Sequence, residues 1–113
     1  MAYITIAPAG GTWVVRAGGA VLAESTNALE LREGDYSPVI YFPRADIAMA
    51  FLESTEKSTH CPHKGDASYF SIVTKSTMLD DAAWTYETPH DDVSAIAGHV
   101  AFYEGDSLAV EQL

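Results

Sequence analysis

The sequence predicts a mostly β fold, either a compact single-domain antiparallel β-sandwich or a partly open, tent-like barrel, with one or two short helical turns. Three observations favour this class. Short segments rich in β-branched and aromatic residues recur along the 113 residues, closely spaced turn signals separate them, and no segment has the pattern of a long amphipathic helix. The chain contains no repeat, low-complexity tract or linker, so residues 1–113 are expected to form one domain.

The clearest local signal is a hairpin near the N-terminus. Two apolar segments flank Gly18-Gly19, and glycine allows the positive φ values that a tight two-residue turn requires. Loops are expected at 33–38 and 88–92, where Pro and Asp interrupt the apolar pattern. The expected strands, in chain order, cover residues 12–16, 20–23, 28–32, 39–42, 69–73, 78–86 and 99–103.

Helical structure is expected only as single turns. Residues 44–48 fit one helical turn followed by extended chain, although the alternation of Ile47, Met49 and Phe51 fits a strand equally well. A second brief turn is expected at 93–95.

Acidic residues outnumber basic ones by 16 to 6, which gives a net charge of −10. A field of this sign repels phosphate backbones and anionic membranes, so we expect no nucleic-acid partner and no membrane binding. No apolar run approaches the length of a membrane span, and the N-terminus lacks the basic flank and apolar core of a signal peptide. The single cysteine excludes an internal disulfide, which together with these features predicts a cytoplasmic protein.

The chemically richest stretch covers residues 58–69 and holds the only cysteine. Positive charge from His60, His63 and Lys64 would favour a thiolate at Cys61. A neighbouring histidine could serve as its base, so Cys61, His60 and His63 are the catalytic candidates. The alternative is that Cys61 is a small buried hydrophobic residue, which is the more common role of a lone cysteine.

The same stretch does not predict a metal site. Adjacent side chains such as His60 and Cys61 cannot easily converge on one ion, and a structural zinc site needs four ligands. Neither a metal nor another cofactor is therefore expected.

Anion binding is a better match to the basic residues. In Lys64-Gly65, glycine lets an anion approach the backbone and lysine supplies charge, but the P-loop pattern is absent because Asp66 follows. Arg44 is the stronger anion partner, since its planar guanidinium can form two hydrogen bonds to one anion. The alternative for both cations is a surface ion pair with a nearby carboxylate such as Asp46 or Asp66.

Aromatic residues on the expected strands complete the candidate site. Trp84 and Tyr86 are two residues apart and would share one face of a strand. Together with Tyr69 they could form a wall beside the two cations and the thiol, as in a small-molecule pocket. The alternative is that most aromatic residues, including Tyr41 and Tyr103, belong to the core.

Four segments carry a resemblance to a known family. They are Tyr41-Phe42-Pro43-Arg44-x-Asp46, Thr59-x-Cys61-Pro62-x-Lys64-Gly65-x-Ala67-x-Tyr69, Asp81-Ala82-Ala83-Trp84-x-Tyr86 and Ile96-x-Gly98-x-Val100-Ala101-Phe102-Tyr103. In this order they are similar to the DUF427 family, small bacterial and fungal proteins named as a domain of unknown function and also labelled nucleotidyltransferase-like. The resemblance covers about residues 13–103. It implies a compact β-rich domain and brings no settled activity.

The nucleotidyltransferase label implies a metal-binding pattern that these residues do not reproduce. Polymerase-type nucleotidyltransferases resemble one another in a Gly-Ser pair followed by two aspartates, two apart, that hold magnesium. This sequence has no Gly-Ser pair. In Asp80-Asp81 and Asp91-Asp92 the aspartates are adjacent, so their side chains would point to opposite faces of a strand.

The function expected from these observations is the binding of a small anionic ligand by a β domain. The expected ligand-binding residues are Arg44, Cys61, Lys64, Gly65, Tyr69, Trp84 and Tyr86. Two alternatives stay open. The first is an enzyme, either one that uses Cys61 as nucleophile or redox thiol, or one with the nucleotidyltransferase-like activity of the family label. The second is a protein-interaction domain that uses an exposed strand edge. The oligomeric state is left open.

Overall fold

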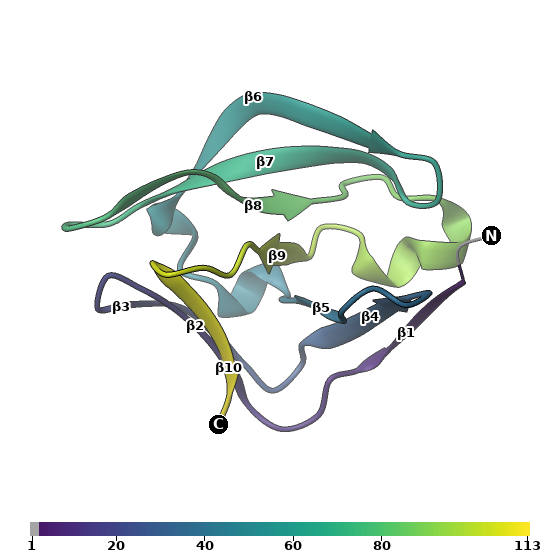
Figure 1. Ribbon diagram of the computed structural model, residues 1–113, viewed down its shortest axis with the longest axis horizontal. Coiled ribbons are helices and arrows are strands. Elements are labelled where there is room, and N and C mark those ends of the chain that lie inside the picture. The colour runs from purple at the N-terminus through teal and green to yellow at the C-terminus, as the bar shows by residue number, and fades with distance from the viewer. Residues whose placement is uncertain (1–2) are drawn as a thin grey trace.

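The computed structural model describes residues 3–113, which form ten β-strands and three short 3-10 turns (Figure 1). In chain order the elements are β1 (Ile4–Pro8), β2 (Trp13–Ala17), β3 (Ala20–Ser25), β4 (Leu29–Glu33), β5 (Val39–Tyr41), η1 (Arg44–Asp46), η2 (Met49–Phe51), β6 (Leu52–Cys61), β7 (Gly65–Val73), β8 (Met78–Thr85), η3 (Asp91–Ile96), β9 (Val100–Phe102) and β10 (Leu108–Gln112).

The strands form three antiparallel sheets, with the orders β1-β4-β5, β10-β2-β3 and β6-β7-β8-β9. The first and last of these sheets meet at Phe42 and Val100, whose backbone groups exchange two hydrogen bonds of 2.8 and 2.9 Å. In Figure 1, β6, β7 and β8 lie on one side of the molecule and β1 and β4 on the other, with β5 and β9 between them. The predicted class, mostly β and antiparallel, is confirmed.

Several elements lie where the sequence pattern predicts them. The N-terminal hairpin is formed by β2 and β3, and its turn holds Gly18 and Gly19 at φ values of 54° and 82°. A side chain is disfavoured at such φ values, which explains why both positions are glycine. The strands expected at 28–32, 39–42 and 99–103 are present as β4, β5 and β9.

The segment after β5 differs from its expected course. The helical turn expected at 44–48 is the shorter turn η1, but the extended chain expected after it is wrong. The chain turns again at η2, where the Phe51 backbone N–H donates to the Ala48 carbonyl at 3.0 Å. Tertiary packing favours this turn, because Met49 and Phe51 lie against the main hydrophobic core. No helix within residues 3–113 is long and apolar enough to cross a membrane.

The sequence pattern does not predict three of the strands. β6 runs through a polar segment because it is an edge strand with most of its residues exposed, so its sequence shows no apolar alternation. β1 and β10 are short terminal strands that pair with β4 and β2. As a result, the turn within the chemically rich stretch is limited to residues 62–64, between β6 and β7.

Two groups of buried side chains lie between the sheets, and alternation along β7 assigns neighbouring residues to different groups. Phe70 belongs to the larger group together with Phe42 and Phe102. Tyr69 belongs to the smaller one. We use the name tyrosine cluster for this smaller group, which consists of Leu31, Tyr41, Ala67, Tyr69, Tyr86, Ile96 and Ala101, together with Cys61 and Trp84 packed against them.

Candidate functional site

Strand register gathers the aromatic side chains of the tyrosine cluster on one face of the sheet. Tyr69 on β7 lies opposite Trp84 on β8, and Tyr86 follows two residues after Trp84. Tyr41 reaches them from β5. Its ring meets the Trp84 ring edge-on at a centroid distance of 6.3 Å, and its hydroxyl accepts a 3.2 Å hydrogen bond from the indole N–H. The predicted wall of Tyr69, Trp84 and Tyr86 is therefore present, with Tyr41 joined to it.

The cluster reaches solvent at Tyr103, which directly follows β9. The Tyr103 ring lies 4.4 Å from the Trp84 ring, centroid to centroid, and the residue is 49% exposed. Tyr41, Tyr69 and Tyr86, by contrast, are all at most 6% exposed. The aromatic wall thus has a buried end and an accessible end.

An ion pair joins the two sides of the molecule beside this wall. The Lys64 ammonium, on the turn between β6 and β7, donates a 2.7 Å hydrogen bond to the Glu33 carboxylate at the end of β4. The two side chains are only 12% and 15% exposed. From the sequence, Asp66 is one example of a carboxylate that could pair with Lys64, but Asp66 binds His60 instead. Nothing in the sequence singles out Glu33, because the two partners are 31 residues apart.

The backbone around Lys64 is held on both sides. The Lys64 N–H donates to the Cys61 carbonyl at 3.2 Å, and the Lys64 carbonyl accepts from the His90 N–H at 2.9 Å. Gly65 has a φ of 115°, a conformation that favours glycine, and a Cβ there would lie 3.5 Å from the Thr88 carbonyl oxygen. Gly65 therefore serves the geometry of the turn that carries Lys64.

Lys64 stays protonated in this environment. Burial by itself lowers the pKa of the ammonium, but the hydrogen bond to Glu33 and the neighbouring Cys61 side chain outweigh it, so the pKa of Lys64 is raised above its ordinary value. The ammonium also lies 6.0 Å from the centroid of the Tyr86 ring. A positive charge is thus fixed next to the thiol and the aromatic wall.

The neighbouring phenols stay neutral. Burial raises the pKa of Tyr86, as does the proximity of Tyr41, and burial also raises the pKa of Tyr41 itself. At the accessible end of the wall, burial and the contact with Tyr69 raise the pKa of Tyr103 to about 12. These hydroxyl groups remain hydrogen-bond donors at neutral pH.

The Tyr86 hydroxyl differs from those of Tyr41 and Tyr69, each of which meets a hydrogen-bonding group of another side chain. Tyr86 is 5% exposed, yet among residues 3–113 its hydroxyl has no hydrogen-bond partner and keeps contact with solvent. By comparison, the Tyr69 hydroxyl lies 2.9 Å from the Thr59 hydroxyl. An almost buried side chain that presents a free donor is typical of a site that receives a ligand oxygen or an ordered water.

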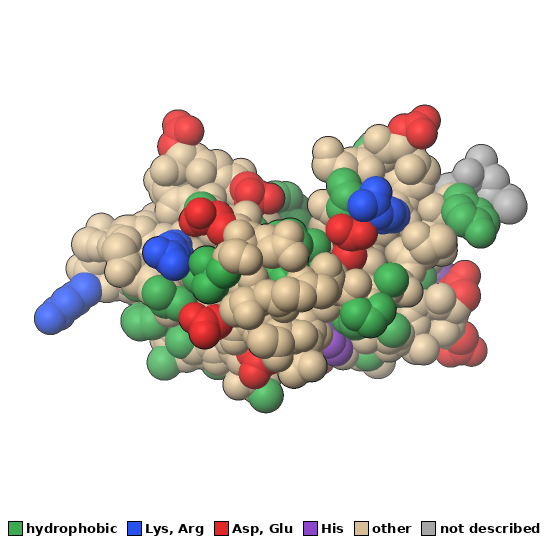
Figure 2. Space-filling model, turned by 90° about the horizontal axis from the view of Figure 1, so that it is seen from below, with side chains coloured by type: hydrophobic (Ala, Val, Ile, Leu, Met, Phe, Trp, Pro, Cys, Tyr) green, Lys and Arg blue, Asp and Glu red, His purple; other side chains and the backbone are tan. Residues whose placement is uncertain are grey.

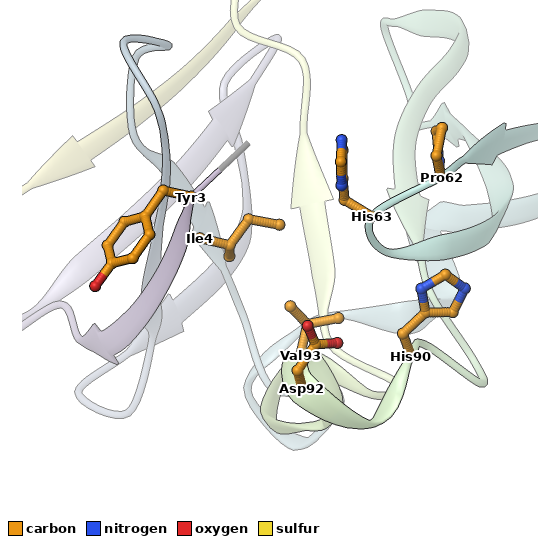
Figure 3. Close-up of a pocket in the computed structure, with 7 residues that line it drawn as sticks. All are labelled: Tyr3, Ile4, Pro62, His63, His90, Asp92 and Val93. Carbon is orange, nitrogen blue, oxygen red and sulfur yellow. The ribbon is translucent and has the colours of Figure 1, made fainter. Parts of the chain in front are cut away.

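A cavity of about 350 Å³ is lined by residues that neighbour the two members of the ion pair (Figure 3). In the register of β1 and β4, Ile4 lies directly opposite Glu33, and His63 immediately precedes Lys64. Figure 3 shows Tyr3 and Ile4 on one side, Pro62, His63 and His90 on the other, and Asp92 and Val93 of η3 below them. The lining residues are Tyr3, Ile4, Pro62, His63, His90, Asp92 and Val93.

Arg44 lies away from the tyrosine cluster. Its Nε–H donates to the Gly98 carbonyl at 2.8 Å, and it forms an ion pair with Glu87. Its guanidinium lies 5.7 Å from the centroid of the Phe70 ring, which belongs to the larger core on the other face of β7. The structure therefore brings Cys61, Lys64, Gly65, Tyr69, Trp84 and Tyr86 together and leaves Arg44 outside this group.

Neither histidine of the stretch forms a hydrogen bond with Cys61 within the described residues. His60 is exposed on β6 and bonds Asp66 at 2.7 Å, and His63 lines the cavity. Cys61 itself is partly exposed and packs against the tyrosine cluster. The charged group close to the Cys61 thiol is the Lys64 ammonium.

On the face seen in Figure 2, the charged side chains of the described residues are distributed without forming a large patch of one sign. Figure 2 shows acidic side chains spread over the face seen from below, with the few Lys and Arg side chains separated from one another. In residues 3–113, no three His, Cys, Asp or Glu side chains are grouped so that they could hold a metal ion. The partly buried Lys64 is therefore the cation whose surroundings differ most from an ordinary solvated surface.

Comparison with known proteins identifies a family without a known activity. No curated protein matches the chain. The model of the family described as "Domain of unknown function (DUF427)" matches residues 5–112, and so includes β10 and most of β1, which lie outside the 13–103 range of the sequence resemblance. The chain therefore belongs to the DUF427 family.

Proposed function

We propose that this protein binds a small anionic molecule at the tyrosine cluster, with Lys64 as the charged anchor. The observation that carries the proposal is the free hydroxyl of the nearly buried Tyr86 beside a protonated, largely buried Lys64. An ammonium and neutral phenols are all hydrogen-bond donors, and a group of donors in a low-dielectric environment favours a negatively charged oxygen.

A thermal-stability screen with small carboxylates, phosphate esters and nucleotides tests this function. At least one class is expected to stabilise the wild-type protein, because a ligand that binds only the folded state adds RT ln(1 + [L]/Kd), about 2.7 kcal/mol at one hundred times Kd. The stabilisation should vanish in Lys64→Gln and weaken in Tyr86→Phe. Since the Tyr86 hydroxyl has no hydrogen-bond partner among residues 3–113, its removal should leave the fold intact.

Arg44→Gln is the matched control for this screen. Arg44 is also a cation in one of the four segments that resemble the DUF427 family, but it lies outside the tyrosine cluster. Stabilisation by the ligand should therefore persist in this variant. Stabilisation that survives Lys64→Gln but disappears in Arg44→Gln would place the anion at Arg44 and contradict the proposed site.

A second candidate function is thiol chemistry at Cys61. The observation in its favour is the proximity of Cys61 to the Lys64 ammonium, whose pKa it helps to raise, since a nearby positive charge stabilises a thiolate. An enzyme of this kind should be alkylated rapidly by iodoacetamide at neutral pH, and Lys64→Gln should slow the reaction. Slow alkylation in the wild type, with no effect of the substitution, would exclude Cys61 as an activated nucleophile.

A further inference from the structure

The charges beside the tyrosine cluster restrict the kind of anion that fits. Lys64 supplies one positive charge, and Glu33 already balances it at 2.7 Å. The other cation near the aromatic wall, Lys57, is exposed on β6 and lies over the Tyr69 ring at 4.6 Å. Asp92 adds a negative charge to the adjoining cavity, and the whole chain carries a net charge of −10. A dianion would therefore meet more repulsion than attraction.

Glu33 occupies the position that a ligand carboxylate would take. A carboxylate on Lys64 is the contact observed in the structure, so a ligand with the same group can replace Glu33 without a new cation. Glu33 is the last residue of β4, and Gly34 at a φ of 53° begins the loop that follows. Because Glu33 ends the strand, its displacement from Lys64 by a ligand carboxylate would leave the strand pairing of β4 in place.

The adjoining cavity has the size for one small planar group, and its lining is mixed, with His63, His90 and Asp92 beside apolar residues. Its volume of about 350 Å³ is near the lower end of the range for small-molecule sites. Ile4, Val93 and Pro62 supply apolar surface (Figure 3). Ile4 lies opposite Glu33 in the strand register, so a ligand in the cavity would lie beside the Glu33 side chain.

We infer that the ligand is a monocarboxylate with a small planar or apolar body, and that it binds by displacing Glu33 from Lys64. Glu33 thus acts as an internal competitor that occupies the anion position in the free protein. Phosphate esters and nucleotides are the disfavoured class, because they bring two or more charges to one cation. This inference rests on the proposed anion-binding function and specifies its ligand class and its regulation.

Titrations followed by NMR and calorimetry at pH 8 test the inference with four probes. Benzoate and phenylacetate are monocarboxylates with a planar ring, benzamide is the neutral counterpart of benzoate, and phenyl phosphate is the dianion. Either carboxylate should bind the wild type with millimolar or tighter affinity, and the other two probes more weakly. Glu33→Gln should bind the carboxylate about tenfold more tightly, because the competing charge is gone. Glu33→Ala provides a second test if the amide of Gln keeps a contact with Lys64.

Glu30→Gln is the matched control, since Glu30 is on the same strand but pairs with Arg32. It should leave the carboxylate affinity unchanged. Stronger binding of phenyl phosphate than of benzoate, lost in Lys64→Gln, would overturn the monocarboxylate inference and leave anion binding intact. If both Glu33 variants bind the carboxylate with unchanged or weaker affinity, the inference that the ligand displaces Glu33 from Lys64 is wrong. Absence of binding by every charged probe, in wild type and Glu33→Gln alike, would count against the proposed function itself.

Discussion

Replacement of Lys64 by Met is expected to lower the free energy of unfolding by about 2 to 4 kcal/mol, because it leaves the Glu33 carboxylate largely buried and without its cation. The pair is 12% and 15% exposed, so little solvent is available to either charge. Removal of both charges in Lys64→Met/Glu33→Leu should recover much of this loss, since no unpaired charge then remains. Urea unfolding of the wild type, both single variants and the double variant measures the coupling between the two residues.

Arg32→Met is the control for this cycle. Arg32 pairs with Glu30 on β4, but its side chain is 62% exposed, and exposed pairs contribute at most about 1 kcal/mol. If Lys64→Met costs no more than Arg32→Met, the Lys64–Glu33 pair is effectively solvated and its role as an anchor between β4 and the β6–β7 turn is lost. A double variant less stable than either single variant would contradict the electrostatic explanation.

The stability of the wild-type protein is expected to fall steeply above about pH 10, the ordinary tyrosine value. Burial raises the pKa of Tyr86 and of Tyr41 in the folded state, so above this pH the unfolded chain loses phenolic protons that the folded chain retains. The unfolded state then binds fewer protons, and stability decreases as the pH rises. Below pH 10 both states hold these protons, and the contribution is constant.

Each retained proton contributes a slope of about 1.4 kcal/mol per pH unit. The pKa of Tyr103, raised to about 12 by burial and by Tyr69, acts in the same direction, but its solvent exposure reduces its weight. Urea unfolding at intervals from pH 8 to the alkaline limit measures the slope, and tyrosinate absorbance shows whether ionisation coincides with unfolding. Tyr86→Phe should make the slope shallower. Equal slopes for the wild type and Tyr86→Phe would show that Tyr86 ionises equally well in both states.

The sequence predicted those features that depend on neighbouring residues. Gly18-Gly19 predicts a hairpin because its backbone conformation is local, and both φ values are positive as expected. Trp84 and Tyr86 share a face because side chains alternate along a strand. The sequence pattern does not predict β6, because an edge strand exposed on both faces has no alternation of apolar and polar residues.

The tertiary structure alone decided how the chemically active residues are grouped. Arg44 and Lys64 are two of only six basic residues, and both lie in segments that resemble the DUF427 family. In the structure, however, Arg44 lies over Phe70, on the face of β7 opposite to that of Tyr69. Glu33 and Lys64 meet although 31 residues separate them.

By itself, then, the sequence determined the mostly β class, the main turns and the aromatic wall, because these follow from the backbone geometry of adjacent residues. The ion pair, the free Tyr86 hydroxyl and the adjoining cavity were decided by the pairing of β1 with β4 and by the contact between Phe42 and Val100. Such long-range pairing depends on the simultaneous burial of many side chains, and no local pattern encodes it.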